Sequence, residues 1–174
     1  MLRTERLELR EPQLSDVDDL LDFVGDGEVQ RWIGGEAGDR AAAVETVERW
    51  IARWRLNGVG QFVVLRDGRA IGRVGLLVWD ERVWETSTYE RAGEHAVSEL
   101  GWALARAAWG RGYATEAAQA VRAWAYAECG VERLISLIDP RNVRSIRVAD
   151  KLGAEPERLV ATDHGPALVW VHPR

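Results

Sequence analysis

The sequence predicts an α/β fold in which a mixed, mostly antiparallel sheet carries helices on both faces. Three observations predict it. Apolar side chains alternate with polar ones in several short stretches, and two long segments repeat apolar residues at helical spacing. In the second half, a strand, a helix and another strand follow one another. The chain has 174 residues, enough to bury a core, and we expect one domain over residues 1–174.

Composition and charge argue against several classes of protein. The net charge of -5 disfavours a nucleic-acid-binding face. Cys129 is the only cysteine, so no internal disulfide can form and the reducing cytoplasm is the expected location. The sequence has no run of about 18 apolar residues, and residues 1–10 lack the apolar segment of a signal peptide. We therefore expect neither a nucleic acid nor a membrane as a partner.

The first part of the chain predicts one strand followed by short helices. Leu7 and Leu9 alternate with charged residues, which is typical of a short strand. Ser15 is a suitable N-cap for a helix that runs through Val24. A second helical piece is expected around residues 28–33, between glycine-rich breaks.

A long helix and a hairpin are expected next. The apolar residues between 39 and 56 fall on one helical stripe, which Asn57-Gly58 ends. This stripe consists of Val44, Val47, Ile51 and Trp54. Two apolar strands, 62–65 and 70–78, flank Asp67-Gly68, a dipeptide that strongly indicates a hairpin turn.

The following elements predict one parallel pair in the sheet. Residues 80–93 are acidic and irregular, which predicts an exposed loop. Residues 95–104 alternate as a strand, a helix is expected over 112–129, and a short apolar strand is expected over 134–138. Because a helix joins these two strands, we expect them to be parallel neighbours.

One more helix and two strands complete the predicted fold. The helix over 142–152 follows Pro140, and strands near 158–160 and 168–171 flank a turn at 163–165. The sheet is therefore expected to have about seven strands.

Gly110-Arg111-Gly112 lies between the strand 95–104 and the helix that follows it. Two glycines let the backbone approach a ligand closely, and the first amides of a helix lack intrahelical acceptors. Such a turn binds an anion, usually a phosphate, and Arg111 can add a charged contact. A plain turn that starts a helix is an equal alternative. A dinucleotide-binding fold requires a third glycine where Thr115 stands, and the Gly-Lys-Ser/Thr of a P-loop is absent.

A second polar cluster follows the strand 134–138 directly. Asn142 is well placed to cap the next helix, which is a sufficient structural role by itself. Ser145 is expected in the first turn of that helix, near the strand ends that carry the glycine turn. If the two parallel strands splay apart there, the gap can hold an extended ligand beside a hydroxyl and an amide side chain.

Two motifs carry a resemblance to a known family. The first comprises Glu99-Leu100-Gly101-Trp102 and Trp109-Gly110-Arg111-Gly112-Tyr113-Ala114-Thr115-Glu116-Ala117. The second comprises Asp139-Pro140-Arg141-Asn142-Val143-Arg144-Ser145-Ile146-Arg147-Val148 and Lys151-Leu152-Gly153. Together they resemble the cofactor motifs of the GNAT acetyltransferases, and they are most similar to the RimJ/RimL-like branch, the ribosomal-protein-alanine acetyltransferases and their relatives. The order of elements matches that family over nearly the whole chain.

The resemblance implies an N-acetyltransferase that uses acetyl-CoA and no metal ion. Acetyl-CoA would lie between the strands 95–104 and 134–138, with its pyrophosphate on the backbone amides of residues 110–114 and its pantetheine arm beside Asn142. Ser145 is the candidate acid that protonates, or hydrogen-bonds, the departing thiolate. The implied cofactor-binding residues are Leu100, Trp102, Ala103, Leu104, Trp109, Gly110, Arg111, Gly112, Tyr113, Ala114, Thr115, Asn142, Ser145 and Arg147.

The sequence departs from the family pattern at three positions. Ala107 stands where the motif often opens with Gln or Arg, which removes a side chain but no backbone donor. Ala149 stands where many members carry a tyrosine acid, so the acid role falls to Ser145 or to water. Ala154 replaces the phenylalanine that usually follows Gly153, and we expect this change to alter packing only.

Acetyl transfer requires a neutral amine, and three residues are candidate bases. Glu99 is the first choice because it lies on the strand face opposite Leu100, and Glu94 and His95 lie nearby in the chain. An ordinary buried ion pair or a solvated carboxylate is the alternative role for Glu99. Proximity alone can also drive the reaction without a dedicated base.

The sequence leaves the class of the acceptor amine undecided. An α-amine, with a pKa of roughly 7.7–8.0, is partly neutral at pH 7, which favours a peptide or protein N-terminus. The alternatives are an acetyltransferase for a small amine (an amino sugar, a polyamine or an antibiotic) and a catalytically silent acyl-CoA-binding module. Strand edges permit a homodimer. The acidic residues expected around the acceptor are Asp80, Glu81, Glu85, Glu90 and Glu94, and the candidate lining tryptophans are Trp32, Trp79 and Trp84.

Overall fold

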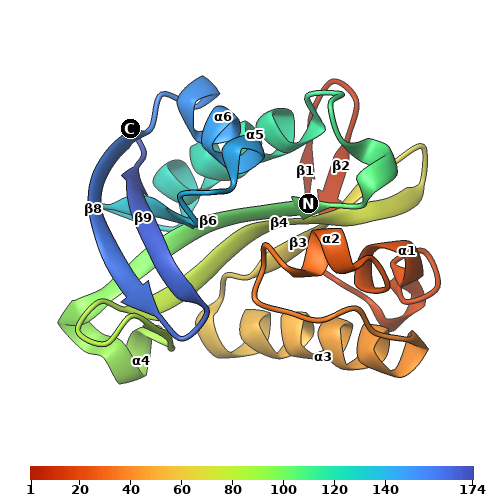
Figure 1. The fold of residues 1–174 in the computed structure, drawn as a ribbon, viewed down its shortest axis with the longest axis horizontal. Coiled ribbons are helices and arrows are strands. Elements are labelled where there is room, and N and C mark those ends of the chain that lie inside the picture. Colours follow the sequence, from red (N-terminus) through yellow and green to blue (C-terminus); the bar gives the residue numbers. More distant parts are fainter.

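The computed structural model describes residues 1–174 and shows a twisted sheet with helices on both faces (Figure 1). The α-helices are α1 (Leu21–Val24), α2 (Gly27–Gln30), α3 (Arg40–Asn57), α4 (Tyr89–Ala92), α5 (Tyr113–Glu128) and α6 (Val143–Lys151). The strands are β1 (Leu2–Arg3), β2 (Glu8–Arg10), β3 (Gln61–Arg66), β4 (Arg69–Asp80), β5 (Glu85–Thr86), β6 (Ala96–Leu104), β7 (Leu134–Ile138), β8 (Glu155–Thr162) and β9 (Gly165–Val171).

The sheet has the order β1-β2-β3-β4-β6-β7-β9-β8, with β5 paired to β4 outside this path. The pair β6–β7 is parallel and every other pair is antiparallel. The predicted mixed sheet with one parallel pair is therefore confirmed. It has nine strands rather than about seven, because β1 and β5 contain two residues each and are too short to show an alternating pattern.

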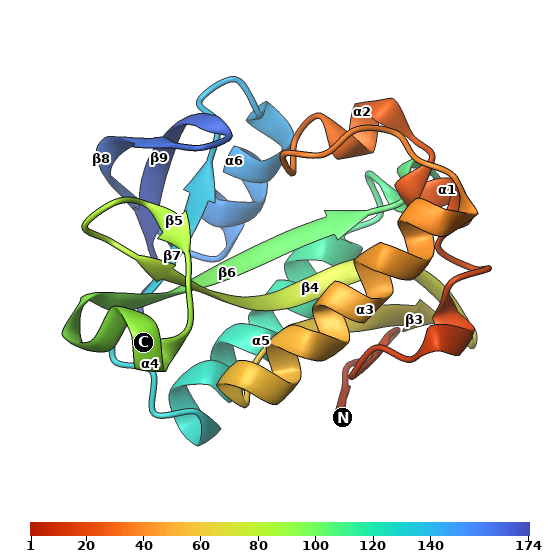
Figure 2. The ribbon, with the colours of Figure 1, turned by 90° about the horizontal axis from the view of Figure 1, so that it is seen from below.

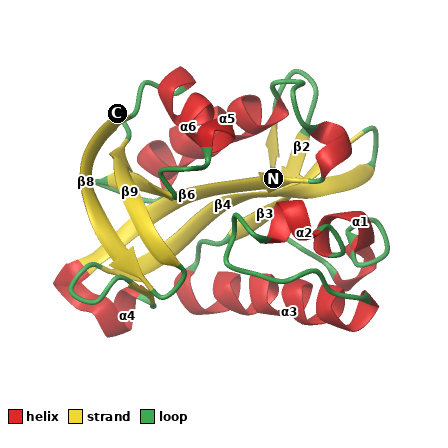
Figure 3. Cartoon of the chain, in the orientation of Figure 1, coloured by secondary structure: helices red, strands yellow, loops and turns green.

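Helices cover both faces of the sheet, as Figure 3 shows with helices in red and strands in yellow. One core cluster lies between the sheet and α5, where Ala117 and Val121 are fully buried. A second lies under the N-terminal helices and α3, where Val47 and Trp50 are buried. No helix of the structure is both long enough and apolar enough to cross a membrane.

The short N-terminal helices begin at other residues than the sequence predicts. Ser15 does not cap a helix that runs to Val24; a single 3-10 turn spans Leu14–Asp16, and α1 begins only at Leu21. The reason is Asp16, whose buried carboxylate accepts the Gln13 backbone N–H at 2.8 Å and pairs with Arg10. These bonds fix a tight turn in place of a longer helix.

The two long helices lie within two residues of the predicted bounds, because their ends carry strong capping signals. The Asp39 carboxylate accepts the backbone N–H groups of Ala41 and Ala42 at the start of α3, and Gly58 ends α3 with φ = 67°. The predicted loop 80–93 instead contains β5 and α4, where Thr88 caps one helical turn. Such short elements leave too little pattern to be predicted.

The parallel strands separate soon after they meet. Cα pairing between β6 and β7 is limited to Ser98 with Leu134 and Glu99 with Ile135, although β6 continues to Leu104. Figure 2 shows the two strands diverging beyond this point. The expected splay is therefore present, and it opens on the side where the glycine turn begins α5.

Candidate acyl-transfer site

Two hollows meet where β6 and β7 separate. The first, which we name the α5–α6 groove, has a volume of about 370 Å³ and lies between the end of β6, residues 108–115 and the start of α6. The second, the α3 cavity, has a volume of about 510 Å³ and lies between α3, β4, β6 and the β8–β9 hairpin. Five residues line both hollows: Trp32, Ile33, Trp102, Asn142 and Ser145. We call these five residues the junction.

The glycine turn has the geometry of an anion site. Gly110 and Gly112 have φ values of 73° and 82°, a left-handed conformation that costs other residues roughly 1–2 kcal/mol. Helix α5 begins at Tyr113, so its first backbone N–H groups have no intrahelical acceptor. They lie beside the groove that Gly112, Ala114 and Thr115 line. Helix N-termini of this kind bind phosphates.

Nearly all of the residues expected to bind the cofactor line the groove. Two lie elsewhere. Leu100 is fully buried and lines the α3 cavity, and Arg111 lines neither hollow. The Arg111 carbonyl accepts a hydrogen bond from Arg6 at 3.0 Å. The residues that line the groove as expected are Trp102, Ala103, Leu104, Trp109, Gly110, Gly112, Tyr113, Ala114, Thr115, Asn142, Ser145 and Arg147.

Helix α6 supplies the positive charge that was expected from Arg111. Arg144, Arg147 and Lys151 line the groove together. The Arg144 guanidinium lies 4.6 Å from the centre of the Trp109 ring, a cation–π contact. Sequence reasoning missed Arg144 and Lys151, although the spacing of three and then four residues already places all three side chains on one helix face.

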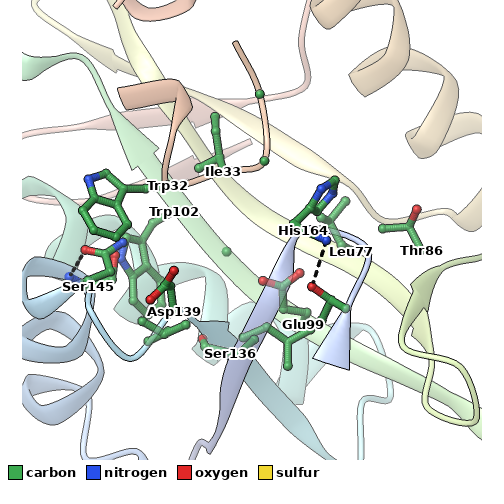
Figure 4. Close-up of a pocket in the computed structure, with 18 of the residues that line it drawn as sticks. Trp32, Ile33, Leu77, Thr86, Glu99, Trp102, Ser136, Asp139, Ser145 and His164 are labelled. Atoms are coloured by element: carbon green, nitrogen blue, oxygen red, sulfur yellow. Dashed lines mark hydrogen bonds between the residues drawn. The ribbon is translucent and has the colours of Figure 1, made fainter. Parts of the chain in front are cut away.

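Asn142 and Ser145 start α6 at the junction. The Asn142 Oδ1 accepts the Ser145 backbone N–H at 3.2 Å, which confirms the predicted N-cap. Because this bond uses the amide oxygen, the amide NH2 remains available as a donor. Ser145 is half buried and lines both hollows. In Figure 4 Ser145 lies with Trp32 and Trp102 at one end of the α3 cavity, and Glu99 and Thr86 lie toward the other.

Glu99 lies in the α3 cavity, on the opposite face of β6 from Leu100, as predicted. The Trp79 indole Nε1 donates a hydrogen bond to Glu99 Oε2 at 2.6 Å. Burial raises the pKa of Glu99, and the Trp79 bond and the nearby Arg73 charge oppose part of that rise. A carboxylate with a raised pKa accepts a proton more readily near neutral pH.

The other expected bases and acidic residues lie outside both hollows. His95 and Glu94 precede β6 on its far side from the splay, and Asp80 is paired with Arg82 at 2.5 Å. Residues 80–94 fold as β5, α4 and their turns at the end of the sheet, which removes their carboxylates from the cavity. None of the acidic residues expected around the acceptor therefore lines either hollow. Trp32 and Trp79 line the α3 cavity as expected, whereas Trp84 does not.

A buried pair that the sequence did not point to lies where β6 and β7 begin to separate. The Ser136 hydroxyl donates to the Leu100 carbonyl oxygen at 2.6 Å and lies 2.8 Å from His172 Nε2. Burial lowers the pKa of His172 to about 4, so this imidazole is neutral and its Nε2 carries the hydrogen that Ser136 accepts. A single serine in an apolar strand gives no signal of this role in the sequence.

Comparison with known proteins identifies the family. Residues 6–155 match the family described as acetyltransferase (GNAT) domain. The chain belongs to the GNAT acetyltransferases. This assigns it as an acetyl-CoA-dependent acyltransferase, with acetyl-CoA as the cosubstrate.

Individual relatives agree with this family. This GNAT acetyltransferase is 27% identical over 157 residues to the uncharacterized N-acetyltransferase YnaD of Bacillus subtilis, covering 90% of this chain and 83% of the relative. The crystal structure of an acetyltransferase from Agrobacterium tumefaciens is 29% identical, with a TM-score of 0.78 and coverage of 99% and 94%. The structure of AAC(6')-Ib with ribostamycin and coenzyme A has a TM-score of 0.77 at 21% identity, covering 98% and 94%, and shows that the fold is shared.

Proposed function

We propose that this GNAT acetyltransferase transfers an acetyl group from acetyl-CoA to the α-amine of a peptide or protein N-terminus. The amine attacks directly while both substrates are bound. One observation carries the proposal: the α5–α6 groove and the α3 cavity meet at Trp102, Asn142 and Ser145, so two ligands can reach one point from opposite sides.

The groove fits acetyl-CoA. The free amides at the start of α5 are donors for the pyrophosphate, and Arg144, Arg147 and Lys151 add charges for the phosphates. The Asn142 NH2 is a donor for the pantetheine arm. When bound, acetyl-CoA supplies the thioester carbonyl that the amine attacks.

Two side chains carry the proposed proton transfers. Glu99 accepts a proton from the acceptor amine, directly or through water, because burial raises its pKa. Ser145 at the junction donates a hydrogen bond to the departing sulfur and relays a proton to it from solvent water, so that the serine ends as a neutral hydroxyl. Holding both reactants in one geometry supplies a further part of the rate.

An α-amine is the favoured acceptor because its pKa, roughly 7.7–8.0, leaves a reactive fraction neutral at pH 7. The two sequence motifs, at residues 99–117 and 139–153, are together most similar to the RimJ/RimL-like branch, which supports the same choice. A small-amine acetyltransferase is the second candidate, because AAC(6')-Ib, solved with ribostamycin, shares this fold.

The proposal also covers assembly and location. The outer edges of β1 and β8 have no partner strand, so a second copy could pair there to form a homodimer. The single cysteine, Cys129, suits a reducing cytoplasm. Light scattering of the purified protein tests the assembly, with a homodimer expected and a monomer at all concentrations contradicting it.

The test combines binding with turnover. Calorimetry is expected to show that acetyl-CoA and CoA bind, and a thiol-release screen is expected to show turnover with N-terminal peptides. Turnover with small amines but not with peptides would instead indicate a small-amine acetyltransferase. Binding without thiol release for any amine would indicate a catalytically silent acyl-CoA-binding module instead.

A further inference from the structure

The floor of the α3 cavity is positively charged. Arg49 and Arg53 reach it from α3 and Arg73 reaches it from β4, while Glu99 is the carboxylate beside them. Arg49 and Arg53 are four residues apart on one helix face, so their charges repel each other. On this floor, three positive charges therefore lie beside one negative charge.

The protein itself does not neutralise this excess. Arg53 is half buried and makes no side-chain hydrogen bond, and Arg73 donates at 2.9 Å to the neutral Gln61 Oε1. Burial lowers the pKa of Arg73 to about 10, and the attraction of Glu99 opposes part of that effect. Both arginines therefore remain charged at neutral pH, with capacity to bind an anion.

Two other charged side chains of the cavity already have partners. Arg31 pairs with Glu28 at 3.1 Å, and Asp139 pairs with Arg141 at 2.6 Å. The half-exposed Asp163 carboxylate, at the turn of the β8–β9 hairpin, lies 3.6 Å from His164, whose imidazole is not a permanent cation. With Asp163 counted, three guanidinium groups still face two carboxylates, so the positive excess remains.

Gly101 places this charge next to the junction. A Cβ built on Gly101 would lie 2.9 Å from Arg73 Nη1 and 3.4 Å from Glu99 Oε1, so the missing side chain makes room for both groups. The next residue, Trp102, belongs to the junction. Because one strand residue spans about 3.3 Å, an acceptor that reaches Trp102 at the junction also lies close to the Arg73 guanidinium beside Gly101.

We propose that the acceptor of this site is an amine that carries a carboxylate close to its amino group. The carboxylate contacts Arg53 and Arg73 while the amine lies between Glu99 and the junction. Two sources share this chemistry: a free amino acid with its α-carboxylate, and a peptide with an acidic residue next to its N-terminal amine. Polycationic amino sugars are disfavoured, because the same arginines repel them. The inference rests on the acetyl transfer proposed above and specifies the charge that its acceptor carries.

Matched acceptors test the proposal by thiol release. One pair is an amino acid and its carboxamide, and the other is a peptide with glutamate at its second position and the same peptide with glutamine. We expect kcat/KM to be about tenfold higher for the carboxylate member of at least one pair, the effect of one charge-assisted hydrogen bond. The pair that shows this preference identifies the acceptor as either a free amino acid or a peptide with an acidic second residue. Equal or better turnover of the amides, or of a polycationic amino sugar, overturns the proposal.

Variants connect the preference to the cavity floor. Arg53→Gln is expected to abolish the preference for the carboxylate and to leave the Kd for acetyl-CoA unchanged. Arg55→Gln, on the exposed side of the same helix, is the matched control and is expected to retain the preference. A preference that survives both Arg53→Gln and Arg73→Gln overturns the assignment to these arginines.

A binding measurement separates this inference from the proposed function. The CoA-loaded protein is titrated with the N-acetylated product acid and with its amide, in the wild type and in Arg53→Gln. Tighter, Arg53-dependent binding of the acid supports the inference even if no thiol is released, in which case the proposed function alone fails. Equal binding of acid and amide overturns the inference even if turnover is observed.

Discussion

The Trp79 indole Nε1 donates a hydrogen bond of 2.6 Å to Glu99 Oε2 inside the α3 cavity. This bond stabilises the charged form of the carboxylate, while burial favours the neutral form. Because burial is the larger effect, the pKa of Glu99 is raised. Trp79 therefore holds Glu99 in place as a hydrogen-bond acceptor inside the α3 cavity.

Glu99→Gln is expected to lower kcat by about a hundredfold or more, a usual contribution of general acid–base catalysis. The substitution retains the size of the side chain and removes the proton acceptor. In Trp79→Phe the charged carboxylate loses its donor, so the pKa of Glu99 rises further and the acidic limb of the pH–rate profile moves to higher pH. A profile that neither variant alters would show that the reaction uses no base at this position.

The raised pKa of Glu99 also predicts a pH dependence of stability. The favourable contribution of the protonated carboxyl is fully present below the ordinary glutamate pKa and is lost as the pH rises through the raised value. Glu99→Gln is therefore expected to raise Tm at about pH 8 and to change it little at about pH 4. Thermal unfolding at both values checks this, and a lower Tm at the higher pH would mean that pairing with Arg73 outweighs burial.

Ser145→Ala is expected to lower kcat by about ten- to a hundredfold, because one hydrogen bond to a charged group contributes about 1.5–3 kcal/mol. The Kd for acetyl-CoA is expected to stay constant, because calorimetry without an acceptor amine measures binding before any acyl transfer takes place. Unchanged turnover with intact binding would remove Ser145 from the mechanism and leave the thiolate to be protonated by water.

The two ends of α5 offer a matched pair of glycine substitutions. Gly110 and Gly130 have φ values of 73° and 65°, and a Cβ at either would meet no atom within 4 Å. Replacing either glycine with alanine is expected to destabilise the fold by roughly 1–2 kcal/mol, because alanine is strained in this left-handed conformation. Only Gly110→Ala is expected to weaken acetyl-CoA binding, because it displaces the amides that face the groove. Equal affinity in both variants would argue against the glycine turn as the phosphate site.

Arg147→Gln is expected to raise the Kd for acetyl-CoA about tenfold and to make binding less sensitive to salt, because one phosphate contact is lost. Arg141→Gln is the control, since Arg141 is paired with Asp139 outside the groove. Calorimetry at two salt concentrations checks both variants. A loss of affinity in Arg141→Gln equal to that in Arg147→Gln would indicate a general charge effect.

The sequence predicts the elements that carry strong local signals. Asp39 and Gly58 bound α3, Asn142 caps α6, and the helix between two apolar strands requires the parallel pair. The groove was predictable for a similar reason, because its residues are contiguous in two motifs. Arg111 lines neither hollow, and the position of a residue in a turn does not specify the direction of its side chain.

The α3 cavity shows what local pattern cannot predict. Arg53, Arg73 and Glu99 come from three separate elements and meet only after the sheet has formed. The acidic residues of 80–94 are adjacent in sequence to β6, which suggested an acidic pocket, yet none of them lines either hollow. Long-range pairing, such as Ser136 with Leu100, likewise has no signal in the neighbouring residues.

Amine-dependent thiol release from acetyl-CoA tests the central claim most directly. Wild-type protein is mixed with acetyl-CoA, with and without a panel of N-terminal peptides, amino acids and small amines, and free CoA is measured over time. The account predicts release that requires both substrates and that falls in Ser145→Ala and Glu99→Gln. Tight acetyl-CoA binding without amine-dependent release in any mixture would contradict it.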